Sequence, residues 1–158
     1  MRYLFVIVTI LLAMFTPQLL HAQERLTAIV TESEINTSPL LVRARSRIPS
    51  FAVDLQADQA VTETTLNISG RQFSIVSIWT LSIDAQGQLS WTAESSAINT
   101  LQIDSSRLDT LNLIVRRLLE DIIADCVYRQ VKIEYRAHRL ERVRLTENDL
   151  ALSIVRDR

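Results

Sequence analysis

The chain has 158 residues with 17 basic and 18 acidic side chains, which gives a net charge of −1 at neutral pH. This balance gives no reason to expect a nucleic-acid partner, because nucleic-acid-binding domains carry clustered positive charge. Its single cysteine excludes an internal disulfide bond, so packing alone must hold the fold together.

The first 22 residues have the three parts of a secretory signal peptide. Arg2 supplies a positive charge, residues 3–15 form an apolar run, and Leu20-His21-Ala22 places a small residue at a cleavage site. The run is shorter than the roughly 20 apolar residues of a membrane-spanning helix. We therefore expect residues 1–22 to be removed and residues 23–158 to form a single exported domain, periplasmic or extracellular. An uncleaved N-terminal membrane anchor is the alternative.

A strand and a short helix are predicted at the start of this domain. Residues 26–30 are rich in strand-forming side chains, and Thr31 with Glu34 three positions later matches a helix capping box. Pro39 is expected to end this helix or to kink it. Arg43, Arg45 and Arg47 then alternate with small or polar residues.

Antiparallel strands are predicted for the next part of the chain. Apolar and polar residues alternate over residues 51–56, 73–83 and 89–93, and the Thr-rich residues 62–68 favour a further strand. Short turns separate these strands, and the loop 84–88 contains a glycine. Successive strands with short connections predict an antiparallel meander.

One long amphipathic helix is predicted from about residue 106 to residue 127. Its apolar side chains follow one another in steps of three or four, which places them on one face. They are Leu108, Leu111, Val115, Leu118, Ile122 and Cys126, and Leu119 and Ile123 widen the stripe.

The C-terminal part permits two interpretations. Residues 131–137 alternate between apolar and polar side chains, which favours a strand with one solvent-facing side. Residues 137–144 are also rich in helix formers, so an extension of the helix is the alternative. Residues 143–145 and 150–155 are predicted to form a hairpin around residues 146–149.

The residue types used in catalysis and metal binding are scarce. His138 is the sole histidine after residue 22 and lies in a basic stretch, which favours a solvated surface position. Cys126 lies on the apolar stripe of the helix, which favours a buried structural cysteine. The spacing of potential ligands offers no metal site. We therefore expect no enzyme activity, no metal and no cofactor.

Basic residues are concentrated between residues 129 and 144. They form either the solvated face of a strand pair or a patch that contacts anionic lipid headgroups. In the second case Arg136, Arg139 and Arg142 are the candidate contacts.

The order of these elements resembles the LmeA-like phospholipid-binding proteins, which are exported envelope proteins distantly similar to tubular lipid-binding domains. The resemblance rests on the hydrophobic pattern, the element order and a few short strings. These strings are residues 31–36, Val53-Asp54-Leu55, Ala85-Gln86-Gly87-Gln88-Leu89 and Ala97-Ile98-Asn99 before the Leu-rich helix. The chain departs from the family at Pro39 and in the charge-dense residues 128–144.

The resemblance implies an α+β fold in which a curved antiparallel meander sheet packs around one long amphipathic helix. It also implies that phospholipid or another apolar ligand binds between sheet and helix, and that the protein carries this ligand between membranes. The expected lining residues are Phe73, Ile75, Trp79, Trp91, Leu111, Ile114 and Leu118, which are alternatively plain core residues. The alternative function is a structural or interaction module with a solid core, which docks through an exposed sheet edge.

Overall fold

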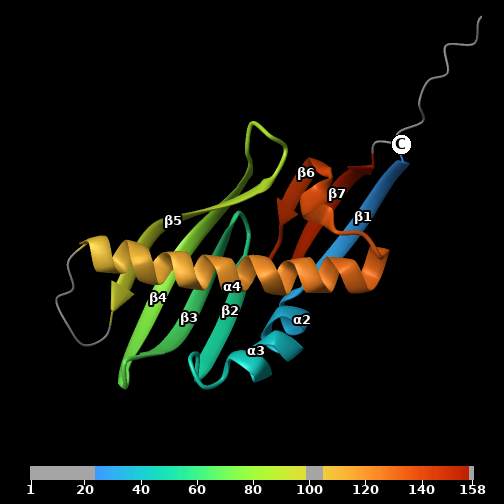
Figure 1. The fold of residues 1–158 in the computed structure, drawn as a ribbon. Coiled ribbons are helices and arrows are strands. Elements are labelled where there is room, and N and C mark those ends of the chain that lie inside the picture. Colours follow the sequence, from blue (N-terminus) through green and yellow to red (C-terminus); the bar gives the residue numbers. More distant parts are fainter. Residues whose placement is uncertain (1–23, 99–104, 157–158) are drawn as a thin grey trace, which may run out of the picture.

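The computed structural model describes residues 24–98 and 105–156, so the predicted signal peptide lies outside the described part. Two antiparallel sheets and one long helix, α4 (Ser105–Val131), make up most of the fold (Figure 1). The predicted α+β class is confirmed. The strands divide into two sheets, however, where the sequence predicted one.

The larger sheet is the predicted meander, with its strands in the order β2–β3–β4–β5. These strands are β2 (Ser50–Gln56), β3 (Gln59–Ile68), β4 (Arg71–Ile83) and β5 (Leu89–Ile98). A two-residue turn, Ser69-Gly70, joins β3 to β4, and both of its residues have positive φ angles. Such a turn matches the twist of the strands it connects, which fixes the register of the hairpin.

The smaller sheet joins the two ends of the described chain. It has the order β1–β7–β6, formed by β1 (Glu24–Thr31), β6 (Arg139–Leu145) and β7 (Asp149–Arg156). β1 pairs with β7 over eight residues, from Glu24 opposite Arg156 to Thr31 opposite Asp149. The predicted hairpin of residues 143–155 is confirmed as β6–β7.

Two short helices connect β1 to β2. The capping box predicted at the start of α2 (Glu32–Asn36) is confirmed, since the backbone N–H of Glu34 donates to Thr31 Oγ1 at 3.1 Å. The prediction that Pro39 ends or kinks this helix is wrong. α2 ends at Asn36, and Pro39 is the first residue of a second helix, α3 (Pro39–Ala44). A proline is well tolerated at this position, because the first N–H groups of a helix have no partner within the helix.

α4 begins close to the predicted position and extends one turn beyond the predicted end. It ends at Val131, because the next residue, Lys132, has a positive φ of 58°. The N–H of Lys132 donates to the carbonyl of Tyr128 at 2.9 Å. The strand predicted at residues 131–137 is therefore wrong. A single 3₁₀ turn (Tyr135–Ala137) follows, and strand structure begins only at Arg139. Within the described residues, no helix has the length and apolar composition needed to cross a membrane.

One main core lies between α4 and the inner faces of both sheets. It contains buried side chains from β1, β2, β3, β4, β5, β6 and β7 together with most of the apolar stripe of α4. A second, smaller cluster of Leu66, Ile75 and Leu111 lies under the N-terminal half of α4. The two sheets are joined at the hairpin between β4 and β5, where the N–H of Leu140 donates to the carbonyl of Gly87 at 2.8 Å.

Side chains from helices close the outer edges of β1 and β2. The side-chain amide of Asn36 forms two hydrogen bonds with the backbone of Val53, each 2.8 Å long. The amide of Gln130 makes the same pair of bonds with the backbone of Ile29, at 3.0 and 2.7 Å. Each amide occupies the position of a neighbouring strand at one residue, so the backbone groups of Val53 and Ile29 are not open to an added strand.

Candidate functional site

The centre of the helix–sheet interface, where the sequence predicted a ligand, is filled with side chains. Trp79 and Trp91 of the sheet are 1% and 2% exposed, and Leu119, Ile122 and Ile123 of α4 are 0% exposed. Interiors packed in this way have few voids larger than a water molecule. The middle of this interface is therefore core.

The remaining predicted lining residues lie in several different surroundings. Ile75 and Leu111 are buried in the small cluster with Leu66, and Leu118 packs half-buried against the main core. Phe73 is half-buried opposite Leu66. Ile114 is 37% exposed and lines a surface pocket. The structure thus does not place the seven residues around one cavity.

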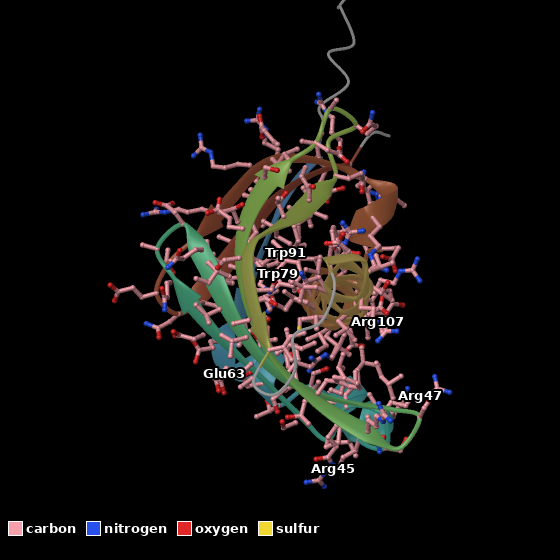
Figure 2. The ribbon with its side chains drawn as sticks, turned by 90° about the vertical axis from the view of Figure 1, so that its left-hand side faces the viewer. Arg45, Arg47, Glu63, Trp79, Trp91 and Arg107 are labelled. Atoms are coloured by element: carbon pink, nitrogen blue, oxygen red, sulfur yellow. The ribbon has the colours of Figure 1, made fainter. Side chains whose placement is uncertain are left out.

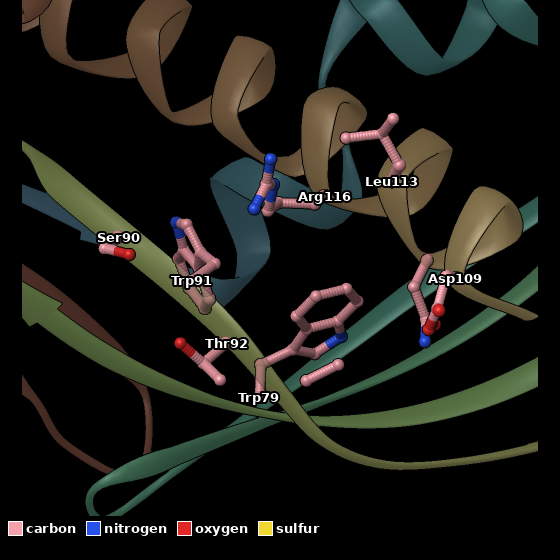
Figure 3. Close-up of a pocket in the computed structure, with 9 residues that line it drawn as sticks. Trp79, Ser90, Trp91, Thr92, Asp109, Leu113 and Arg116 are labelled. Atoms are coloured by element: carbon pink, nitrogen blue, oxygen red, sulfur yellow. The ribbon is translucent and has the colours of Figure 1, made fainter. Parts of the chain in front are cut away.

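A groove of about 420 Å³ lies between β5 and the start of α4 (Figure 3). Both tryptophans line it, but so do the polar side chains of Asp109, Asn112 and Arg116. The indole N–H of Trp79 donates to Thr62 Oγ1 at 2.8 Å, which keeps this ring within the wall. With an acid, an amide and a guanidinium around it, this groove is poorly suited to an acyl chain.

Polar contacts also cross the interface beside this groove. Ser77 Oγ and Ser96 Oγ each lie 3.0 Å from Asn112 Oδ1, and the two serine oxygens lie 3.0 Å from each other. Ser77 is completely buried. A hydrogen-bonded group of this kind separates the main core from the small cluster, so the apolar space between sheet and helix is not continuous.

A second pocket, of about 590 Å³, lies at the end of the larger sheet, and we call it the α3 pocket. It opens between the end of α3, the end of β3 and the N-terminal half of α4. Its wall is mainly apolar, from Ile48, Leu66, Ile68 and Ile114, and two arginines lie at its rim. Its volume is typical of small-molecule sites. The full lining is Arg43, Ala44, Ser46, Arg47, Ile48, Leu66, Asn67, Ile68 and Ile114.

Local hydrogen bonds hold the segment that carries these arginines. The carbonyl of Ala44 accepts from the N–H groups of Arg47 and Ile48, at 2.9 and 2.8 Å. The carbonyl of Arg47 accepts from the N–H of Asn67 on β3 at 2.7 Å. The segment after α3 is thereby attached to the sheet, which fixes the rim of the α3 pocket relative to its floor.

The charged side chains that the structure describes around the α3 pocket are all basic. Arg43 and Arg47 line it, and no acidic side chain of residues 24–98 and 105–156 does. Neither arginine forms an ion pair with any residue of the described part of the chain. A guanidinium binds carboxylate and phosphate oxygens through paired hydrogen bonds. The pocket therefore combines an apolar floor with two unneutralised anion-binding groups.

The arginines predicted to contact headgroups have different surroundings. Arg136 Nη2 donates to Asp121 Oδ1 at 2.9 Å, so its charge is balanced. The aliphatic stem of Arg139 lies against Gly87, where it would clash with a Cβ atom. Arg142 lines a groove on the smaller sheet together with Glu141. A headgroup role for these three residues stays a prediction.

Sequence reasoning missed the α3 pocket, although it noted the alternating arginines from Arg43 to Arg47. Their neighbours Leu66, Ile68 and Ile114 come from distant parts of the chain. Arg43 and Arg47 also lie in and just after α3, a helix that the sequence did not predict. The run of arginines without acidic neighbours in sequence was the single available clue.

Cys126 is completely buried, and Arg129 Nη2 lies 3.2 Å from its sulfur. Burial raises the pKa of the Cys126 thiol, although the nearby Arg129 guanidinium opposes this. A thiol kept protonated is a poor nucleophile. Among residues 24–98 and 105–156, no three His, Cys, Asp or Glu side chains are grouped as a metal site requires.

Comparison with protein-family models, with curated proteins and with solved structures finds no match. The resemblance to LmeA-like proteins therefore stays a prediction, and the case for function depends on the geometry of the site.

Proposed function

We propose that this protein is an exported lipid-binding domain that holds an anionic amphiphile, such as a phospholipid, in the α3 pocket. The observation that carries the proposal is the combination of an apolar floor with an arginine rim to which the described part of the chain contributes no acidic residue. The proposal keeps the ligand class expected from the sequence. It moves the site from the centre of the helix–sheet interface to the end of the larger sheet.

The physical basis is that the two parts of an amphiphile need two kinds of surface. Each methylene group transferred from water to an apolar floor contributes about 0.8 kcal/mol. Ile68 and Ile114 are 38% and 37% exposed, so they have apolar surface left to cover. The guanidinium groups of Arg43 and Arg47 complement a phosphate or carboxylate head. Chain and headgroup would each find a partner within one pocket.

The alternative function is an interaction module with a solid core, and the filled core is the observation that favours it. Its proposed means of docking, an exposed sheet edge, has less support. Asn36 and Gln130 cover the edges of β2 and β1. β5 carries a bulge between its pairings with Ile78 and Trp79. Bulges of this kind are a common means of preventing an edge from adding another strand.

Calorimetric titration with short-chain phosphatidylglycerol, below its critical micelle concentration, tests the proposal. Ile114→Ser should weaken binding about tenfold, because it removes apolar surface from the floor. Leu113→Ser is a matched control, since Leu113 is also 37% exposed on α4 but lines the groove of the tryptophans. Weaker binding in Leu113→Ser alone would place the ligand in that groove. No binding by the unmodified protein would disprove the proposed function.

A further inference from the structure

The outer surface of α3 is both apolar and basic. Val42 is 71% exposed, the largest exposed fraction among the large apolar side chains that the structure describes as exposed. Arg45 is also exposed, and the two residues line a hollow that adjoins the α3 pocket, since Ile48 lines both. Among the residues that the structure describes, no acidic side chain lines this hollow. α3 therefore has positive charge and apolar surface beside both the hollow and the α3 pocket.

The hairpin between β3 and β4 adds to this surface. Arg71 is exposed at its tip and lies opposite Ile68, which lines the α3 pocket. Figure 2 shows Arg45 and Arg47 extending from one end of the molecule, away from the buried Trp79 and Trp91. We call this surface, made of Val42, Arg43, Arg45, Arg47 and Arg71, the α3 face.

The charge of the α3 face is not compensated within the described part of the chain. None of its four arginines forms an ion pair there. By contrast, Arg25, Arg116, Arg129, Arg136 and Arg156 each lie within 4 Å of a carboxylate. Unpaired arginines around an exposed apolar side chain complement a surface that is negatively charged outside and apolar beneath.

We infer that the α3 face docks onto an anionic lipid bilayer, with Val42 entering the headgroup region and the arginines contacting lipid phosphates. Basic residues near such a surface each strengthen binding by about fivefold. This inference rests on the proposed function, because docking here brings the mouth of the α3 pocket to the bilayer from which an amphiphile would enter. It names the bilayer itself as the partner.

Vesicle flotation of the exported protein, in the form that the cell yields, tests the inference. Vesicles of phosphatidylcholine alone are compared with vesicles that also contain phosphatidylglycerol. We expect binding only to the anionic vesicles, and weaker binding at high salt. Arg45→Glu should reduce binding at least about fivefold. Arg142→Glu makes the same change at a headgroup contact expected from the sequence, outside the α3 face, and should have less than about a twofold effect. Both variants have the same N-terminus, so any vesicle binding through the N-terminus is equal in the two. The difference in vesicle binding between them therefore reports on the α3 face.

A fluorescence measurement gives a second readout. Both tryptophans of the described chain are buried, so Val42→Trp adds an exposed indole. Its emission should shift to shorter wavelength on anionic vesicles, and it should not shift on vesicles of phosphatidylcholine alone. Equal losses in Arg45→Glu and Arg142→Glu, or an unchanged emission, would overturn the docking inference.

The two proposals fail in different ways. Arg45 and Val42 do not line the α3 pocket, so their variants should bind monomeric short-chain phosphatidylglycerol as the unmodified protein does. Binding of monomeric lipid without vesicle binding would overturn docking alone. Vesicle binding without binding of monomeric lipid would overturn the proposed function, and docking would then no longer serve loading of the pocket.

Discussion

The two ends of α4 lie in very different surroundings. Its C-terminal half packs on the main core through Leu119, Ile122, Ile123 and other fully buried side chains. Its N-terminal half contributes Leu111 to a cluster of only three buried residues and leaves Ile114 partly exposed beside the α3 pocket. One helix therefore joins a well-packed region to a region with open apolar surface.

The charges of the two ends differ in the same way. Around the C-terminal half, Arg129 and Arg136 form ion pairs with Asp125 and Asp121, at 3.1 and 2.9 Å. Near the α3 pocket, arginines such as Arg47 form no ion pair with any described residue. Regions that bind ligands are commonly the less stable parts of a protein. One end of α4 is thus closely packed and charge-balanced, and the other carries the exposed apolar surface and unpaired arginines on which the proposed binding rests.

The largest expected effect comes from matched truncations in the two clusters. Leu119→Ala should lower the free energy of unfolding by about 3–5 kcal/mol, because it leaves a cavity in the fully buried main core. Leu111→Ala should cost about 2 kcal/mol, because Leu111 is 5% exposed and its small cluster can relax toward solvent. Urea denaturation measures both values. Equal costs would show that the two ends are packed equally well.

Asn36→Ala should have the next largest effect on stability. The side-chain amide of Asn36 satisfies both the N–H and the carbonyl of Val53, so its loss leaves two backbone groups without partners. We expect a cost of about 1–3 kcal/mol in the free energy of unfolding. Asn67→Ala is the control, since Asn67 is exposed on β3, and it should change stability by less than about 0.5 kcal/mol.

Local sequence patterns predicted most of the elements correctly. Thr31 and Glu34 identified the start of α2 because a capping box needs only two residues at a fixed spacing. The spacing of Leu111, Val115 and Ile122 likewise identified α4. Such patterns involve neighbours along the chain, so a single sequence contains all the information that they need.

Features that depend on distant residues could not be predicted in this way. The division into two sheets depends on β1 pairing with β7, at the other end of the chain. The α3 pocket depends on Ile114 lying beside Ile48 and Ile68. The local ion pair of Arg129 with Asp125 follows helical spacing, but that of Arg136 with Asp121 spans a chain reversal. A run of basic residues therefore does not reveal which charges are compensated.

A smaller effect, dependent on pH, is expected at Glu34, which lies near Gln130 at the well-packed end. A hydrogen bond from the backbone of Thr31 holds the pKa of Glu34 below its ordinary value of 4.5. The ionised form is thus favoured in the folded state. Its contribution to stability is present above the unfolded pKa and is lost as the pH falls through the folded pKa.

Glu34→Gln should therefore be less stable than the unmodified protein near neutral pH, and the difference should vanish as the solution is acidified below the ordinary carboxylate range of about 4. Urea denaturation over this pH range measures the difference. A difference that stays constant with pH would mean that Glu34 acts by shape and not by charge. Thr31→Ala, which removes the partner hydroxyl of the capping box, should cost about 1 kcal/mol.

The smallest effect on stability, and the sharpest contrast in binding, is expected for two single arginines. Arg136→Gln and Arg47→Gln both remove one positive charge. The pair of Arg136 and Asp121 is exposed, so its loss should cost less than about 1 kcal/mol in the free energy of unfolding.

Because Asp121 already balances this charge, Arg136→Gln should leave the affinity for short-chain phosphatidylglycerol unchanged. Arg47→Gln should weaken that affinity about tenfold, since a charged hydrogen bond to the headgroup is lost. Equal losses of affinity in the two variants would mean that the net charge of the protein, and not the position of its unpaired arginines, attracts the lipid.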